Sequence, residues 1–150
     1  MHELIIIIAQ YCIAIPVIAY AYIVLSMKAS DRKRFITQSI VAVVATAVLV
    51  KIAAHIHQDP RPFVRDHVRP YFGHSTDNGF PSDHTTFSAL IALLIMTRVK
   101  QLGIALFALA ALIGVARVVA GVHHGQDIVA GLIVATIGFA ISVCVAKCSE

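Results

Sequence analysis

Residues 102–127 read LGIALFALAALIGVARVVAGVHHGQD. The stretch begins as a long apolar run and ends in a short polar segment that contains Arg117, His123 and Asp127. A helix needs about 20 apolar residues to cross the hydrocarbon core of a membrane. The join between the two parts therefore predicts that the polar residues lie at the mouth of a membrane-embedded helix bundle.

The composition of the whole chain agrees with this prediction. The 150 residues are 59% hydrophobic and only 13% charged, and the mean hydropathy is +0.84. Soluble domains carry about 25% charged residues. We therefore expect one integral membrane domain, 1–150, of the all-α class. The net charge of +4 does not indicate nucleic-acid binding, because the basic residues are divided between short loops and the candidate site.

Five apolar segments predict a bundle of about five transmembrane helices. They run from Leu4 to Met27, from about Phe35 to Ile56, from Ser82 to about Met96, from Leu102 to Val119, and from Ile128 to about Ala146. The third is slightly short, and Pro16 predicts a kink in the first. Between them we expect a basic loop at 28–34, a tight turn at 97–101, and a long loop at 57–80 with three prolines and two glycines.

A second polar stretch, Phe80-Pro81-Ser82-Asp83-His84, stands where the third apolar segment begins. Serine is a good N-cap residue, and proline is tolerated where a helix starts. The free backbone N–H groups of such a helix end bind anions. We therefore expect an anion site at Ser82 and Asp83, with His84 in the first helical turn.

The spacing of Arg117, His123 and Asp127 predicts a reactive histidine. On a helix, residues four apart share a face, so Asp127 is predicted to hold the imidazole of His123 by a hydrogen bond. A cation, an oriented histidine, a second histidine and a helix N-terminus are the parts needed for phosphoryl transfer through a covalent phosphohistidine. His124 is the adjacent alternative to His123, and we expect it at the rim of the site.

These motifs, taken in order, carry a resemblance to a known family. Arg61-Pro62, then Pro81-Ser82-x-His84, then Arg117-x5-His123-x3-Asp127 resembles the type 2 phosphatidic acid phosphatase superfamily. Asp59-Pro60-Arg61-Pro62-Phe63 followed by Phe80-Pro81-Ser82-Asp83-His84 resembles its bacitracin-resistance branch, whose members are undecaprenyl-diphosphate phosphatases. The resemblance covers about residues 51–140.

The resemblance implies an enzyme of the bacterial plasma membrane that hydrolyses undecaprenyl diphosphate to undecaprenyl phosphate and phosphate, and so recycles the carrier lipid of peptidoglycan. It implies these roles: His123 as nucleophile, Asp127 as its orienting carboxylate, His84 as general acid, and Arg61, Arg117, Ser82 and the backbone N–H of Asp83 as phosphate-binding groups. The superfamily usually has glycine where Asp83 stands. It also usually has lysine at the position of Ala54, and Lys51, one turn earlier, is the candidate substitute.

The loop at 57–80 and its neighbourhood carry further charged and histidine residues. His55, His57, His67 and His74 are irregularly spaced and lack the tight spacing of metal ligands, so we expect no metal and no other cofactor. Arg65, Asp66, Arg69 and Asn78 are expected near the mouth, where Arg65 and Arg69 would hold the extra charge of a diphosphate.

Loop charges predict the orientation in the membrane. Cytoplasmic loops carry an excess of lysine and arginine. One side collects Lys28, Arg32, Lys33, Arg34, Arg98, Lys100 and Lys147, and is predicted to be cytoplasmic. Both motifs then face the outside, which suits a lipid carrier released at the outer leaflet.

Two alternatives stay open. A phosphatidylglycerophosphate or phosphatidate phosphatase would use the same residues on another membrane lipid. A small transporter or channel would belong to a different class, and it should have polar residues or broken helices near the middle of the membrane. The third to fifth apolar segments have small and apolar residues there, which argues against transport.

Overall fold

The computed structural model describes residues 1–148, which form seven helices and no β-strand. The helices are α1 (His2–Gln10), α2 (Ala14–Ser26), α3 (Ala29–Ile56), α4 (Pro62–Arg65), α5 (Asp83–Met96), α6 (Lys100–Val119) and α7 (Gly125–Cys148). An isolated β-bridge joins Pro60 to Asn78 in the loop after α3. The all-α prediction is confirmed for the described residues.

Four segments are long and apolar enough to cross a membrane: His2–Ser26, which comprises α1 and α2, and then α3, α6 and α7. α5 has 14 residues and is about 21 Å long, so it is shorter than the membrane core of about 30 Å. Large apolar side chains such as Leu25, Ile56 and Val129 are exposed on the outside of the bundle. These surfaces suit contact with lipid, so the structure has four candidate spans and one shorter apolar helix in place of the five predicted spans.

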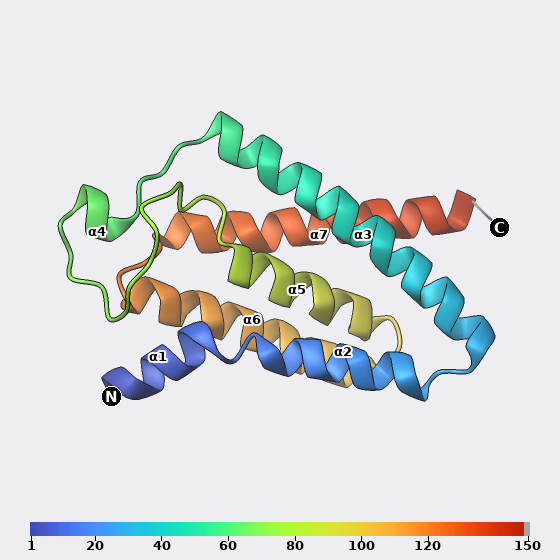
Figure 1. Ribbon diagram of the computed structural model, residues 1–150. Helices are drawn as coiled ribbons and strands as arrows, with labels where there is room; N and C mark the ends of the chain where they lie inside the picture. Colours follow the sequence, from blue (N-terminus) through green and yellow to red (C-terminus); the bar gives the residue numbers. More distant parts are fainter. Residues whose placement is uncertain (149–150) are drawn as a thin grey trace.

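α5 lies at the centre of the bundle, with α6 and α7 packed against it and α3 packed against α7 (Figure 1). Leu90 and Leu94 of α5 are fully buried with Ala110 of α6 and Ala135 of α7. Small residues at these contacts allow membrane helices to approach closely. A short helix surrounded in this way need not reach both membrane surfaces, and its N-terminus stays inside the protein.

The first span is broken between α1 and α2, rather than kinked at Pro16 as predicted. Proline lacks an N–H, and its ring clashes with the carbonyl four residues earlier, here that of Cys12. The chain accordingly leaves the helix over residues 11–13, where the Cys12 N–H bonds to the carbonyl of Ile7 at 3.3 Å. The break leaves carbonyls at the end of α1 without helical partners, and the carbonyl of Ala9 is used by the site described below.

Several predicted boundaries are wrong in the same direction, because the helices extend beyond the apolar runs. The predicted basic loop at 28–34 is mostly helix, since α3 begins at Ala29. Alanine, lysine and arginine favour helices, and Asp31 lies in the first turn, where a negative charge is stabilising. α6 and α7 likewise begin before their apolar runs, and the long loop contains the short helix α4.

Both motifs lie at one end of the bundle. The loop at 57–82 and the turn between α6 and α7 meet there, together with the N-terminus (Figure 1). The backbone N–H of Tyr71 donates to the carbonyl of Ala120 at 3.0 Å, and its ring stacks on His2 at 4.3 Å between centroids. The opposite end carries the short connections at 27–28 and 97–99. The loop is therefore fixed over the end of the bundle that holds the candidate site.

Candidate active site

His123 is buried in the turn between α6 and α7, and Asp127 follows in the first turn of α7. The turn begins at Gly121, whose φ of 73° favours glycine. The predicted hydrogen bond is present: His123 Nδ1 lies 3.1 Å from Asp127 Oδ2. His123 precedes the helix rather than lying on it. The same oxygen accepts the backbone N–H of His124 at 2.8 Å, so Asp127 also caps the start of α7.

The partners of His123 define its tautomer. Arg61 Nη1 lies 3.2 Å from His123 Nε2, and a guanidinium has only donors, so Nε2 must accept. The proton is then on Nδ1, where the carboxylate of Asp127 accepts it. Burial lowers the pKa of His123, and so do the charges of Arg117 and Arg61, although the hydrogen bond to Asp127 acts in the opposite direction. His123 is therefore held neutral with the lone pair of Nε2 facing a cation.

Arg61 is only 5% exposed and connects His123 to the long loop. Its Nη1 also donates to the carbonyl of Val122 at 3.0 Å, and its Nε and Nη2 each lie 3.0 Å from Asp77 Oδ1. One part of the guanidinium thus faces Nε2 of His123, and the rest contacts the carboxylate of Asp77 in the loop.

Arg117, in the last turn of α6, is 2% exposed. Its Nη1 donates to the carbonyl of Ala9 at 3.0 Å, and its Nη2 donates to His74 Nε2 at 2.9 Å. Nε is buried and makes no hydrogen bond within residues 1–148. A buried donor without an acceptor costs about 1–3 kcal/mol. An oxygen-rich anion would reduce that cost.

The N-terminus of α5 brings the first motif to the second. Ser82 is the N-cap residue, as predicted, and its N–H donates to the backbone carbonyl of Asp127 at 3.1 Å. Its hydroxyl accepts from Thr85 Oγ1 at 3.2 Å and forms no cap to a backbone N–H. The first N–H groups of a helix have no partners inside the helix. They remain as donors for an anion.

His84 and Arg117 line one cavity of about 430 Å³ at this end of the bundle. The other lining residues are Gln10, Tyr11, Phe72, Gly73, His74 and Ser75. His84 is partly buried in the first turn of α5, and Asp83 beside it is exposed. The structure therefore brings together His84, Ser82, Arg117, Arg61, His123 and Asp127, which the sequence predicts to form one site.

His74 is a site residue that the sequence did not predict. Besides its hydrogen bond to Arg117, its ring lies edge-on to that of His123 with 6.2 Å between centroids. Burial and the charges of Arg61 and Arg117 lower its pKa. A single histidine in an irregular loop has no spacing that would identify it, so only the folded loop reveals its position.

His124 belongs to a separate network around Asp59. His124 Nδ1 lies 2.8 Å from Asp59 Oδ2, which also accepts from Gln126 Nε2 at 2.6 Å, and Arg65 Nη1 lies 3.0 Å from Asp59 Oδ1. Burial raises the pKa of Asp59, but the hydrogen bonds from Gln126 and His124 and the charge of His124 hold it below its usual value. Arg65 Nη2 also lies 2.9 Å from His124 Nε2, so both ring nitrogens of His124 contact the long loop.

Among the described residues, three that could together bind a metal ion lie in this network. Asp59, His124 and Asp127 bring ligand atoms within 4.8 Å of one another. The oxygens of Asp59 already accept hydrogen bonds from Arg65, Gln126 and His124. The arrangement is accounted for as a hydrogen-bonded support for the turn before α7.

Three further basic residues were considered from the sequence, and of these Arg65 and Arg69 lie in the loop at the site end. Lys51 is exposed on α3, and no hydrogen bond or ion pair within residues 1–148 joins it to the site. Arg65 pairs with Asp59 and Asp66, both at 3.0 Å, so its charge is already balanced. Arg69 is exposed and, within the described chain, has no carboxylate partner.

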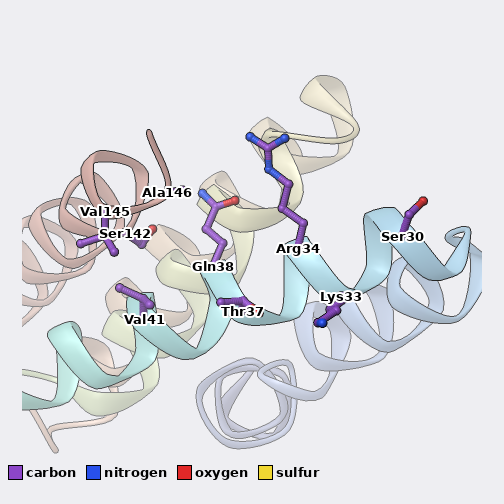
Figure 2. Close-up of a pocket in the computed structure, with 9 residues that line it drawn as sticks. All are labelled: Ser30, Lys33, Arg34, Thr37, Gln38, Val41, Ser142, Val145 and Ala146. Atoms are coloured by element: carbon purple, nitrogen blue, oxygen red, sulfur yellow. The ribbon is translucent and has the colours of Figure 1, made fainter. Parts of the chain in front are cut away.

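A second cavity, of about 380 Å³, lies at the opposite end between α3 and α7 (Figure 2). Its lining consists of Ser30, Lys33, Arg34, Thr37, Gln38, Val41, Ser142, Val145 and Ala146. These residues include cations but no histidine and no carboxylate. The cavity at the other end instead contains His74, His84 and Arg117, and the ring of His74 lies 6.2 Å from that of His123.

Comparison with known proteins places this geometry in a family. A family model described as the PAP2 superfamily matches residues 35–149. The chain belongs to the PAP2 superfamily. Every residue of the site from Asp59 to Asp127 falls in the matched region, whereas Ala9, which fixes Arg117, lies before it.

Two Bacillus proteins are among the relatives of the chain. The chain is 31% identical over 125 residues to "Undecaprenyl-diphosphatase BcrC" of Bacillus subtilis (strain 168), covering 81% of this chain and 64% of that protein. It is 31% identical over 105 residues to "Bacitracin transport permease protein BcrC" of Bacillus licheniformis, covering 69% of this chain and 52% of that protein. The chain thus spans less than two thirds of the length of these relatives.

A solved PAP2-like structure shares the fold. The crystal structure of Aquifex aeolicus LpxE superposes with a TM-score of 0.70 at 26% identity, covering 94% of this chain and 81% of that one. The match includes nearly the whole chain, so the helical arrangement around α5 is that of LpxE. This likeness agrees with the membership of the chain in the PAP2 superfamily.

Proposed function

We propose that this protein hydrolyses undecaprenyl diphosphate to undecaprenyl phosphate and inorganic phosphate through a phosphohistidine at His123. One observation carries the proposal: the imidazole of His123 is fixed between Asp127 and Arg61, with its Nε2 lone pair directed at a guanidinium. When a phosphate takes over the N–H groups of Arg61, the Nε2 lone pair is released and can attack phosphorus. The guanidinium then holds the phosphate oxygens through paired hydrogen bonds.

In the first step, Nε2 of His123 attacks the distal phosphorus. The bond between that phosphorus and the bridging oxygen breaks as the oxygen takes a proton from His84, and undecaprenyl phosphate leaves. The negative charge of the bound diphosphate favours the protonated form of His84 that this step needs. Asp127 stabilises the positive charge that develops on the imidazole. Arg61, Arg117 and the first N–H groups of α5 stabilise the charge on the transferred group.

In the second step, water attacks the phosphorus of the phosphohistidine. His84, now neutral, accepts a proton from that water, and the bond between phosphorus and Nε2 breaks. The products are inorganic phosphate and neutral His123, so the enzyme is restored with no net change in its protons. No step requires a metal ion or another cofactor.

The choice of lipid rests on the relatives and on the charge at the site. The Bacillus subtilis relative is named an undecaprenyl-diphosphatase, and the two buried arginines suit a strongly charged phosphate end. The excess of lysine and arginine at the opposite end of the bundle supports a cytoplasmic location for that end. The site would then face the outside of the plasma membrane, where the carrier diphosphate is released.

Phosphate release by the purified protein tests the proposal. The panel contains undecaprenyl diphosphate, phosphatidylglycerophosphate and phosphatidate, each with and without a chelator. We expect the highest kcat/KM on undecaprenyl diphosphate and no effect of the chelator. If phosphatidylglycerophosphate or phosphatidate is hydrolysed as well as undecaprenyl diphosphate or better, the protein is a phosphatase of that glycerolipid instead. If no phosphate is released from any of these lipids, the proposed phosphatase activity is wrong, and a transporter is favoured instead.

A further inference from the structure

The segment His74-Ser75-Thr76-Asp77 contacts both arginines of the site. Asp77 Oδ1 lies 3.0 Å from Nε and from Nη2 of Arg61, and His74 Nε2 lies 2.9 Å from Nη2 of Arg117. Both arginines come from other elements, since Arg61 precedes α4 and Arg117 ends α6. One loop segment thus supplies acceptors to the two groups that would hold a phosphoryl group.

These acceptors resemble the ligand chemically. The carboxylate of Asp77 takes two N–H groups of Arg61, which is how guanidinium also binds phosphate oxygens. His74 offers a neutral nitrogen to Arg117, because burial and the nearby Arg61 and Arg117 lower its pKa. A phosphate oxygen and either acceptor therefore require the same donors and exclude each other.

The segment is held in place by contacts of its own, yet it is accessible. Ser75 Oγ donates to Asp77 Oδ1 at 2.7 Å, and His74 Nδ1 lies 3.3 Å from Ser75 Oγ. The side chain of Asp77 is 63% exposed, whereas that of Arg61 is 6% exposed. Ion pairs with an exposed partner contribute little free energy, because water screens the charges. A more highly charged anion can therefore replace Asp77 without unfolding the site.

We propose that Asp77 and His74 are specificity-determining residues that compete with the substrate for Arg61 and Arg117, so that only a strongly charged phosphate end displaces them. The inference rests on the proposed phosphate chemistry of the site. A diphosphate end carries more charge than a monoester and displaces the segment more readily. A phosphodiester, with a single charge, displaces it least. The loop thereby selects the substrate class without contacting the lipid chain.

The affinity for orthovanadate, a phosphate analogue that needs no turnover, tests the competition directly. Asp77→Asn should bind vanadate about fivefold more tightly than the wild type, because the competing charge is removed. His74→Ala should also bind it more tightly, and this change removes no charge because His74 is neutral. Ser75→Ala should shift affinity in the same direction by a smaller factor, since Asp77 then loses one supporting hydrogen bond.

Asp31→Asn is the matched charge control, because Asp31 lies at the opposite end of the bundle beside Arg34 and Thr97. It removes the same charge and should leave vanadate affinity unchanged. Unchanged or weaker vanadate binding in either Asp77→Asn or His74→Ala overturns the inference. Asp77→Asn should also lower KM for phosphatidate more than for undecaprenyl diphosphate, with a smaller effect on kcat.

Different results would reject the proposed function and this inference. If the wild type releases no phosphate from any lipid, the proposed function is wrong, and the vanadate affinities still decide whether the segment competes for the arginines. If the wild type hydrolyses undecaprenyl diphosphate but Asp77→Asn binds vanadate no more tightly, the proposed hydrolytic activity is retained and the proposed competition is rejected. In that case Asp77 only positions Arg61.

Discussion

At the scale of single residues, the reactivity of His123 depends on which of its nitrogens carries the proton. The carboxylate of Asp127 takes the proton on Nδ1, and the guanidinium of Arg61 faces Nε2. The neighbouring His124 has partners of the same kind, since Asp59 Oδ2 lies 2.8 Å from its Nδ1 and Arg65 Nη2 lies 2.9 Å from its Nε2. The two histidines differ in burial, because the side chain of His123 is 3% exposed beside the buried Arg61, whereas that of His124 is 17% exposed beside the half-exposed Arg65. Burial therefore favours His123 as the reactive histidine.

The lowered pKa of His123 predicts the acid limb of the activity profile. Protonated His123 has no lone pair, so kcat/KM falls as the pH drops through its pKa. Because that pKa lies below the ordinary histidine value of 6.5, the midpoint of the fall should lie below pH 6.5. In Asp127→Asn it should move lower still, since the carboxylate raises the pKa of His123. A midpoint at or above 6.5 in the wild type, measured as kcat/KM against pH, would contradict this assignment.

The spacing of residues along the sequence was sufficient to predict part of this site. The interval of four residues between His123 and Asp127 predicted their hydrogen bond, because such an interval brings side chains together at or near a helix. It was not sufficient for His74 and Asp77, which lie in an irregular loop and reach Arg117 and Arg61 only through tertiary contacts. Lys51 was proposed from a shifted interval, and it lies exposed on α3.

At the scale of helices, the site depends on how closely α7 approaches the start of α5. Gly131 of α7 faces this contact, and a Cβ built on it would lie 2.8 Å from Thr86 Oγ1 and 3.2 Å from the carbonyl of Ser82. The same approach allows the Ser82 N–H to bond to the carbonyl of Asp127 at 3.1 Å. A small residue in α7 thus keeps the two motifs together.

Gly131→Val should separate α7 from α5. Overpacking of this kind costs about 1–3 kcal/mol, and displacement of Asp127 should lower kcat as well. Gly125→Ala is the matched control, because a Cβ there meets no atom within 4 Å. Thermal unfolding in detergent and kcat are the measurements. A Gly131→Val protein with the stability and kcat of Gly125→Ala would show that the close approach is dispensable.

Apolar runs located the helices but not their ends. The run from Phe35 to Ile56 predicted the second span, while the helix itself begins at Ala29, because a basic segment outside the hydrocarbon can still be helical. The break before Pro16 was displaced by one turn from its predicted position, since the proline ring acts on the carbonyl four residues earlier. Hydropathy reports the environment of a residue, whereas helix ends depend on hydrogen bonds and caps.

At the scale of the whole molecule, the two ends of the bundle differ in chemistry. One end carries the long loop with its histidines. At the other end, Lys33 and Arg34 line one cavity (Figure 2), and Arg34, Arg98 and Lys147 line a second. Cytoplasmic ends of membrane proteins are enriched in such residues. This asymmetry predicts that the site faces the outside.

Cysteine labelling in intact cells tests the orientation. In a background without Cys12, Cys144 and Cys148, a single cysteine is introduced by Thr76→Cys at the site end or by Ser30→Cys at the basic end. An impermeant thiol reagent should label the Thr76→Cys protein only, and both should react after the cells are opened. Labelling of the Ser30→Cys protein alone in intact cells would reverse the orientation and remove access to an outer-leaflet substrate.

The phosphoenzyme is the most direct test of the central claim, which is covalent catalysis by His123. The purified protein is mixed with undecaprenyl diphosphate labelled in its distal phosphate, stopped in alkaline detergent to preserve phosphohistidine, and mapped by mass spectrometry. We predict label on His123 in the wild type and in His124→Ala. His123→Ala should carry no label and should lose several orders of magnitude in kcat. Label on His124, or turnover by His123→Ala at the wild-type rate, would contradict the account.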